Sequence, residues 1–276
     1  MKNESLATRT KAPAAVAYLL FLQVFLSIIA GTVGGGIGRI VYMLSYLTPI
    51  VLFAFLARKI GLFLQLRPTR DGFGRVLPLL PIFLTAVVLT AAGTSEIMKL
   101  LGQEAVGGTA EGAGFLSDLF TDCLFPAVLE EGLMRFAVLS LLLIWSDRHA
   151  VWVCALLFSL LHASIYQIPY AFVGGMFLGL AAVWGSSPLY AILFHFLSNL
   201  LSLFMQYAVI WFGEETGTYV SLGLCLVIFL LAAWGTLVLL RRTRQEKKPA
   251  PATDWRALLL SPLSLFAIMM IILTVL

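Results

Sequence analysis

Charged side chains are scarce in this chain. Of its 276 residues, 12% are Asp, Glu, Lys or Arg, whereas 61% are hydrophobic. A soluble domain carries roughly 25% charged residues, so a surface with half that charge could not keep this chain in water. Cysteine is scarce as well, and three cysteines cannot form the disulfide framework of a secreted scaffold. Aromatic residues, by contrast, make up 12% of the chain, which excludes a disordered protein.

Long apolar runs recur along the whole sequence, which is typical of a helical integral membrane protein. A membrane-spanning helix needs about 20 mostly apolar residues. Nine runs are candidates: 13–33, 39–57, 76–95, 115–145, 150–166, 169–185, 188–212, 218–240 and 257–276. We therefore predict an all-α, polytopic transmembrane bundle of eight to nine spans, forming a single membrane-embedded domain over residues 1–276. No nucleic-acid partner is expected, although the net charge is +4.

Three of the runs depart from simple spans. The fourth contains Pro126, which removes a helical hydrogen bond and is expected to kink or restart the helix. The runs 150–166 and 169–185 are short and are separated only by Gln167 and Ile168. Their proximity predicts a tight helical hairpin.

The basic residues predict the orientation of the bundle. If nine spans alternate from a cytoplasmic N-terminus, 15 of the 18 Lys and Arg residues lie in inside segments, and only Arg39 and Lys99 lie outside. This asymmetry follows the positive-inside rule, so we expect a cytoplasmic N-terminus. The expected location is the cell membrane, specifically a bacterial plasma membrane. The basic segments 58–75 and 241–256 are expected to contact lipid headgroups.

Glycines recur at the four-residue spacing that brings membrane helices close together. Gly31 with Gly35, Gly34 with Gly38, and Gly175 with Gly179 have this spacing, which predicts close helix packing at each place. The cluster at 34–38 does not follow a strand or complete the G-x-G-x-x-G pattern, so we do not interpret it as a nucleotide site.

Ionisable residues are costly inside a bilayer, and the apolar runs contain an unusual set of them. The sequence LEEGLMRFAV contains Glu130, Glu131 and Arg135, FSLLHAS contains His162, and LFHFLSNL contains His195 and Asn199. Helical geometry places Glu131 and Arg135 on one face, where they can pair, and it also places His195 beside Asn199. Glu130 is turned about 100° from Glu131. We therefore expect Glu131 to neutralise Arg135 and Glu130 to perform chemistry.

Taken together, E-E-x-x-x-R at 130–135, F-x-x-x-H at 158–162 and H-x-x-x-N at 195–199 resemble the CPBP family of intramembrane proteases, which includes the CAAX prenyl endopeptidase Rce1 and the bacterial Abi proteins. The resemblance implies a peptidase that cuts peptide or protein substrates at or near the membrane. It also implies a core at about 115–212, with accessory spans at about 13–95 and 218–276. The resemblance further implies six site residues: Glu130, Glu131, Arg135, His162, His195 and Asn199.

Peptide hydrolysis requires an activated water and a donor for the oxyanion. The hypothesis is that Glu130 acts as the general base on a water that is also bonded by His162. His195 and Asn199 would then stabilise the oxyanion, and no cofactor would be required. An alternative is a catalytic zinc bound by Glu130, His162 and His195, because His₂Glu is a known zinc ligand set.

Two further classes of function remain open from the sequence. A transporter would also place Glu, His and Arg in the membrane, but it predicts an internal repeat, and the polar residues are confined to 130–199. A non-catalytic membrane scaffold or regulator would keep the same motifs. The sequence does not indicate an oligomeric state.

Overall fold

The computed structural model describes residues 6–60, 68–102, 114–143 and 147–243, and every regular element in these ranges is helical. The predicted all-α class is therefore confirmed for this part of the chain. In chain order the helices are α1 (Leu6–Val33), α2 (Gly35–Ile60), α3 (Arg70–Val76), α4 (Leu79–Leu100), α5 (Phe115–Asp118), η1 (Leu119–Leu124), α6 (Phe125–Glu131), η2 (Gly132–Val138), α7 (Leu139–Leu142), α8 (Asp147–Leu161), α9 (Ile168–Gly185), α10 (Pro188–Phe212) and α11 (Glu214–Thr243).

Six of the described helices are long and apolar enough to cross a membrane. They comprise Lys11–Val33, Gly35–Ala57, Leu79–Leu100, Ile168–Gly185, Pro188–Phe212 and Glu214–Arg242. The predicted runs 115–145 and 150–166 are helical over Phe115–Leu142 and up to Leu161, but the first is divided into short segments and the second is shorter than a full span. The predicted span 257–276 lies outside the described residues. The count of eight to nine spans and the cytoplasmic N-terminus remain predictions.

The fourth predicted run is a composite helix. Two π-helical segments, η1 and η2, flank the short α6. A π-helix closes its hydrogen bonds over five residues instead of four, so each segment changes the angle at which later side chains leave the axis. Pro126 lies in the first turn of α6, next to the boundary with η1. Leu124 before this boundary keeps helical dihedrals, with φ −75° and ψ −51°, so the chain stays helical across the proline. The kink or restart expected at Pro126 is therefore seen only as a change of helix type.

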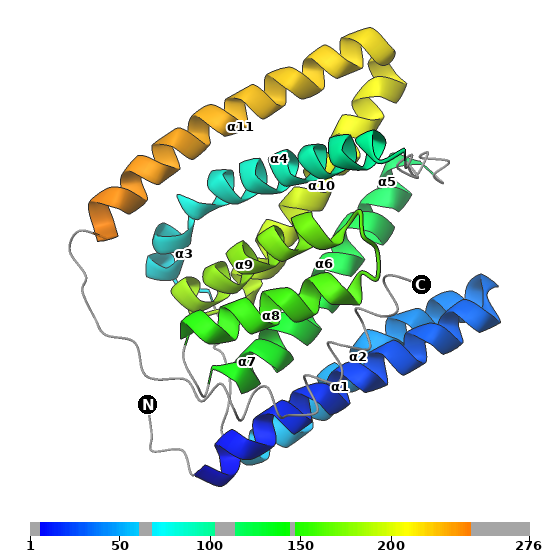
Figure 1. The fold of residues 1–276 in the computed structure, drawn as a ribbon, viewed down its shortest axis with the longest axis vertical. Helices are drawn as coiled ribbons and strands as arrows, with labels where there is room; N and C mark the ends of the chain where they lie inside the picture. The colour runs from blue at the N-terminus through cyan, green and yellow to red at the C-terminus, as the bar shows by residue number, and fades with distance from the viewer. Residues whose placement is uncertain (1–5, 61–67, 103–113, 144–146, 244–276) are drawn as a thin grey trace.

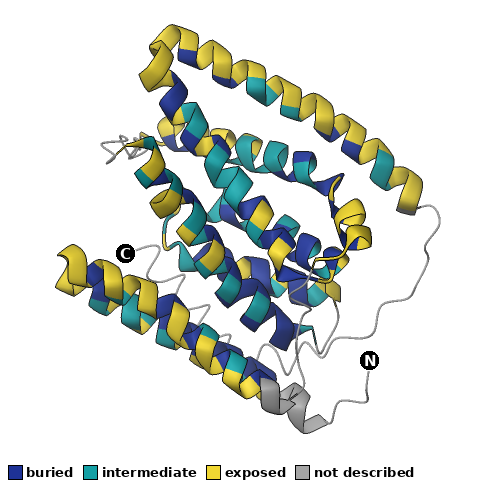
Figure 2. Cartoon of the chain, turned by 180° about the vertical axis from the view of Figure 1, so that it is seen from behind, coloured by how far each residue is buried: buried dark blue, intermediate teal, exposed yellow. Residues whose placement is uncertain are grey.

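The helices form a packed centre with exposed elements on two sides (Figure 1). The α1–α2 hairpin lies along one side of the bundle and α11 along the other, next to α4 and α10. Both outer elements present exposed apolar side chains, such as Phe25 and Ile37 on the hairpin and Leu222 on α11 (Figure 2). Exposed apolar faces on helices of this length fit contact with lipid. The central helices, by contrast, bury most of their side chains.

Helices α3 and α11 bring the basic segments 58–75 and 241–256 into contact. In α11, the Arg242 guanidinium donates a hydrogen bond of 3.0 Å from Nη1 to the carbonyl oxygen of Gly74 in α3. These two segments were expected to lie on the same side of the membrane. Their contact agrees with that expectation without fixing which side it is.

The glycines at the four-residue spacing pack closely at some positions and face open space at others. At Gly175 and Gly179 the predicted close packing is confirmed, because an added Cβ would lie 3.1 Å from the Ala155 Cα and 2.9 Å from the Val151 Cγ1, respectively. In the α1–α2 hairpin, Gly38 also lies against a backbone, with the Ala30 oxygen 2.6 Å from its ideal Cβ. Near Gly31, Gly34 and Gly35, however, an added Cβ would meet nothing within 4 Å. The prediction of close packing is wrong at these three positions because they face open space.

Candidate active site

Two neighbouring carboxylates end the short helix α6, and the fold places them in different surroundings. Glu131 is fully buried, whereas the side chain of Glu130 is 16% exposed. This separation agrees with the predicted turn of about 100° between successive helical residues. The two glutamates therefore have different neighbours.

Glu131 lies at the centre of an enclosed polar network. Its Oε1 is 3.0 Å from Arg135 Nη1, and neither side chain is exposed. The predicted pairing of Glu131 with Arg135 is therefore present. A second amino group of the guanidinium, Nη2, donates to the Gly175 carbonyl oxygen at 2.9 Å, and the guanidinium carbon lies 4.5 Å from the centre of the Phe158 ring. Arg135 is thus anchored to α9 and α8 as well as to its own helix.

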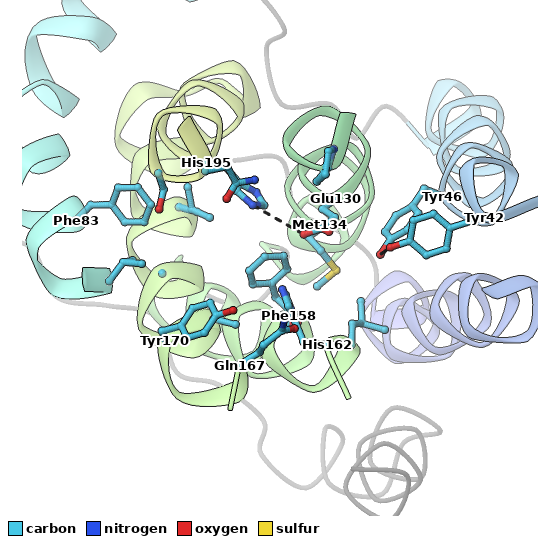
Figure 3. Close-up of a pocket in the computed structure, with 18 residues that line it drawn as sticks. Tyr42, Tyr46, Phe83, Glu130, Met134, Phe158, His162, Gln167, Tyr170 and His195 are labelled. Atoms are coloured by element: carbon cyan, nitrogen blue, oxygen red, sulfur yellow. Dashed lines mark hydrogen bonds and ion pairs between the residues drawn. The ribbon is translucent and has the colours of Figure 1, made fainter. Parts of the chain in front are cut away.

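His195 joins this network from α10. Its Nδ1 lies 2.8 Å from Glu131 Oε1, and because a carboxylate only accepts hydrogen bonds, Nδ1 carries the proton. This bond orients the ring so that Nε2 faces Glu130, with 4.0 Å between Nε2 and Glu130 Oε2 (Figure 3). The sequence did not reveal the contact between Glu131 and His195. The two residues are 64 positions apart, and helical spacing relates only residues on one helix.

A cavity of about 490 Å³ opens beside Glu130. It is lined by four of the six predicted site residues: Glu130, His162, His195 and Asn199. Figure 3 shows Glu130, His162 and His195 around this cavity, each from a different part of the bundle. Glu131 and Arg135 do not line it. The four lining residues are those to which the sequence hypothesis assigns the water and the oxyanion, and they come together at one cavity.

His162 lies one residue beyond the end of α8, not within a span as expected. The next residue, Ala163, has a φ of +46°, so the chain turns sharply at this point. His162 Nδ1 is 2.9 Å from the Phe158 carbonyl oxygen, which requires Nδ1 to be the donor. The Nε2 atom thus remains available to other groups. The ring also packs edge-to-face on Phe158, with 4.9 Å between the ring centres.

Asn199 lines the cavity from α10, one turn after His195. Its amide nitrogen donates one hydrogen bond of 3.3 Å to the backbone carbonyl oxygen of Asp122 in η1. A carboxamide has two N–H groups, so the second remains available. The π-helical segment before α6 therefore helps to orient a side chain on α10.

Aromatic residues from outside the motifs complete the cavity wall. Tyr42 and Tyr46 of α2 lie at one side and Phe83 of α4 lies at the opposite side (Figure 3). The hydroxyl oxygens of the two tyrosines are 3.4 Å apart. Sequence reasoning missed these residues, since an isolated aromatic in an apolar run has no feature that separates it from a lipid-facing one.

Within the described ranges, no group of three or more His, Cys, Asp and Glu side chains is arranged to hold a metal ion. The set of Glu130, His162 and His195 does not form such a group, although all three line the cavity. The zinc alternative remains a prediction.

The comparison with protein families adds independent information. A family model described as type II CAAX prenyl endopeptidase Rce1-like matches residues 112–201. The match shows what this part of the chain, about a third of its length, is similar to. The resemblance predicted from the three motifs is thus confirmed, and all six predicted site residues fall within the match. Searches of curated proteins and of solved structures found no match.

The Rce1-like match has two direct consequences. The family is a peptidase family, which supports a peptidase, and together with the long apolar helices it indicates a multi-pass membrane protein. The match ends within α10 and does not include α1, α2, α4 or α11. Tyr42, Tyr46 and Phe83 therefore contribute to the cavity from outside the Rce1-like part.

Proposed function

We propose that this protein is an intramembrane endopeptidase in which Glu130 activates a water molecule for attack on a peptide bond. The observation that carries the proposal is the different surroundings of the two glutamates on α6. Each has one buried carboxylate oxygen, Oε2, without a hydrogen-bond partner among the described residues, but Glu131 is enclosed with Arg135 and His195 on its Oε1, whereas Glu130 lines the cavity. A water or substrate in the cavity can therefore reach the carboxylate of Glu130 and not that of Glu131.

In the proposed reaction, Glu130 takes a proton from a water that His162 also binds. The water oxygen then bonds to the carbonyl carbon of the substrate. Glu130 passes the proton to the departing nitrogen as the carbon–nitrogen bond breaks. A general base positioned in this way contributes typically 10²–10⁴-fold to a rate.

His195 and Asn199 are the proposed oxyanion donors. A doubly protonated His195 donates Nδ1–H to Glu131 and directs Nε2–H into the cavity, and the free N–H of Asn199 adds a second donor. The positive charge on this imidazolium is balanced locally, because two carboxylates face one guanidinium in the network. Glu131 and Arg135 are positioning residues in this proposal, since neither lines the cavity.

The proposed substrates are peptide or protein segments at or near the membrane, and the proposed reaction uses only side chains of this chain. Lipid is the expected surrounding partner of the exposed apolar helices. A bacterial plasma membrane remains the proposed location.

Cleavage by the purified full-length protein in lipid nanodiscs tests the proposal. A mixture of apolar peptides is incubated with the wild type and with Glu130→Gln, and paired products are identified by mass spectrometry. We expect wild-type cleavage that survives a metal chelator, and loss of at least about 100-fold in Glu130→Gln, because glutamine cannot accept the proton. Equal cleavage by both proteins would refute the assignment of Glu130. Loss of wild-type cleavage with chelator, restored by zinc, would refute the metal-free reaction.

A further inference from the structure

A second cavity opens beside the candidate active site. It has a volume of about 570 Å³ and lies between the α1–α2 hairpin and α6. Most of its lining residues are glycines or apolar side chains, including Gly31, Gly34, Gly35, Met43, Phe125 and Leu129. We call this cavity the hairpin groove.

The hairpin groove adjoins the cavity of the candidate active site. Tyr42, Tyr46, Pro126 and Glu130 line both. An occupant of the groove would therefore reach the proposed general base, with the two tyrosines beside it. The groove is built largely from residues outside the Rce1-like match, since α1 and α2 precede residue 112.

The groove is open because three residues of the hairpin that line it, Gly31, Gly34 and Gly35, have no side chains. An added Cβ at Gly31, Gly34 or Gly35 would have no neighbour within 4 Å. Gly34 and Gly35 have φ values of +65° and +57°, so they are needed for the turn between α1 and α2. Gly31 has no such constraint and lies within α1. A larger residue at position 31 would project into the groove without meeting the protein backbone.

We propose that the hairpin groove binds large apolar side chains of the peptide substrate, next to the bond that is cut. This inference rests on the proposed function. A peptide bond in a bilayer must reach polar groups, because an unsatisfied backbone group in hydrocarbon is costly, while its apolar side chains need apolar surroundings. The polar cavity at Glu130 and the adjoining apolar groove supply these two environments side by side. The volume of the groove lies within the range of small-ligand pockets, roughly 300–1,000 Å³.

Filling the groove at one glycine, with a second glycine as the matched control, tests this proposal. Gly31→Trp places a ring in the groove. Gly36→Trp adds the same ring to the same hairpin, at a position that also has free space but does not line the groove. The probes are two benzophenone-bearing peptides that differ only in having leucines or alanines beside the photoreactive group. Labelled sites are mapped by mass spectrometry in the full-length protein.

We expect the leucine peptide to label the groove, and Gly31→Trp to reduce that labelling about tenfold or more, which is the effect of losing apolar contacts in a pocket. In Gly36→Trp the leucine peptide should label the groove as strongly as in the wild type. The alanine peptide should label the groove weakly in every protein. Unchanged labelling in Gly31→Trp, or labelling by a diacyl-lipid probe in place of the leucine peptide, would overturn the proposal.

Labelling is read without turnover, so the two proposals fail separately. Groove labelling by a peptide that the wild type never cleaves would count against the proposed reaction and leave the groove assignment intact. Cleavage that depends on Glu130 but is the same for the leucine and alanine peptides would overturn the groove assignment and leave the reaction intact.

Discussion

The two sides of α6 differ in whether their polar groups reach the cavity. On the enclosed side, Glu131 Oε1 bonds to both Arg135 and His195, and Arg135 also bonds to the backbone of α9. On the cavity side, Glu130 lies 4.0 Å from His195 Nε2, and its Oε2 has no hydrogen-bond partner in the part of the chain that the structure describes. Adjacent residues of the same type therefore have different surroundings. Glu131 Oε2 and Arg135 Nε are also buried without a partner among the described residues, so access to the cavity, not pairing, separates Glu130 from its neighbour.

The largest effect on stability is expected on the enclosed side. Arg135→Met removes the guanidinium and leaves the Glu131 carboxylate buried with His195 alone. Breaking a buried ion pair from one side costs about 3–5 kcal/mol, so the free energy of unfolding should fall by that amount. A detergent-denaturation titration of the purified protein measures it. The double variant Glu131→Gln with Arg135→Met should recover part of the loss, and a double variant no more stable than Arg135→Met would show that the pair is not the cause.

A smaller effect is expected where α9 meets α8. Gly175 contributes its carbonyl oxygen to Arg135, and any side chain there would lie 3.1 Å from the Ala155 Cα. Gly175→Val should therefore force the helices apart and lower the free energy of unfolding by about 1–3 kcal/mol. Gly174→Ala is the matched control, because its new methyl would lie at an ordinary 3.4 Å from Val87. Equal stability of the two variants would mean that the close packing does not support the network.

The smallest effect is expected where α10 meets α5. The Tyr207 hydroxyl donates a 2.7 Å hydrogen bond to the buried Asp118, which directly precedes η1. Tyr207→Phe should cost about 1 kcal/mol, the usual net value of one hydrogen bond. Tyr219→Phe on the exposed face of α11 should cost nothing measurable. If the two variants lose the same amount of stability, the bond to Asp118 is not a constraint on η1.

The sequence predicted what depends on one helix at a time. Apolar run length gave the helical class, and the i,i+4 rule gave the pairing of Glu131 with Arg135. The missing N–H of Pro126 marked the place where the helix changes from π to α. The division into a core and accessory spans remains a prediction, and Tyr42 and Phe83 show that helices outside the predicted core contribute to the cavity wall.

The sequence could not predict what depends on packing between helices. The bond from His195 to Glu131 joins α10 to α6, and no spacing rule relates residues on separate helices. The π-helical segments η1 and η2 were not predicted, because apolar run length does not distinguish a π-helix from the α-helices next to it. The glycines of the α1–α2 hairpin were expected to pack closely, since the spacing is the same whether the Cα atoms face a helix or a groove.

The central claim is that Glu130 performs chemistry while its neighbour Glu131 maintains the site. Its most direct test measures the single-turnover cleavage rate and the free energy of unfolding for Glu130→Gln and Glu131→Gln, side by side. We predict that Glu130→Gln loses at least about 100-fold in rate with unchanged stability, and that Glu131→Gln loses stability. Cleavage at the wild-type rate in Glu130→Gln, or the same loss of rate in both variants with no change in stability, would contradict the account.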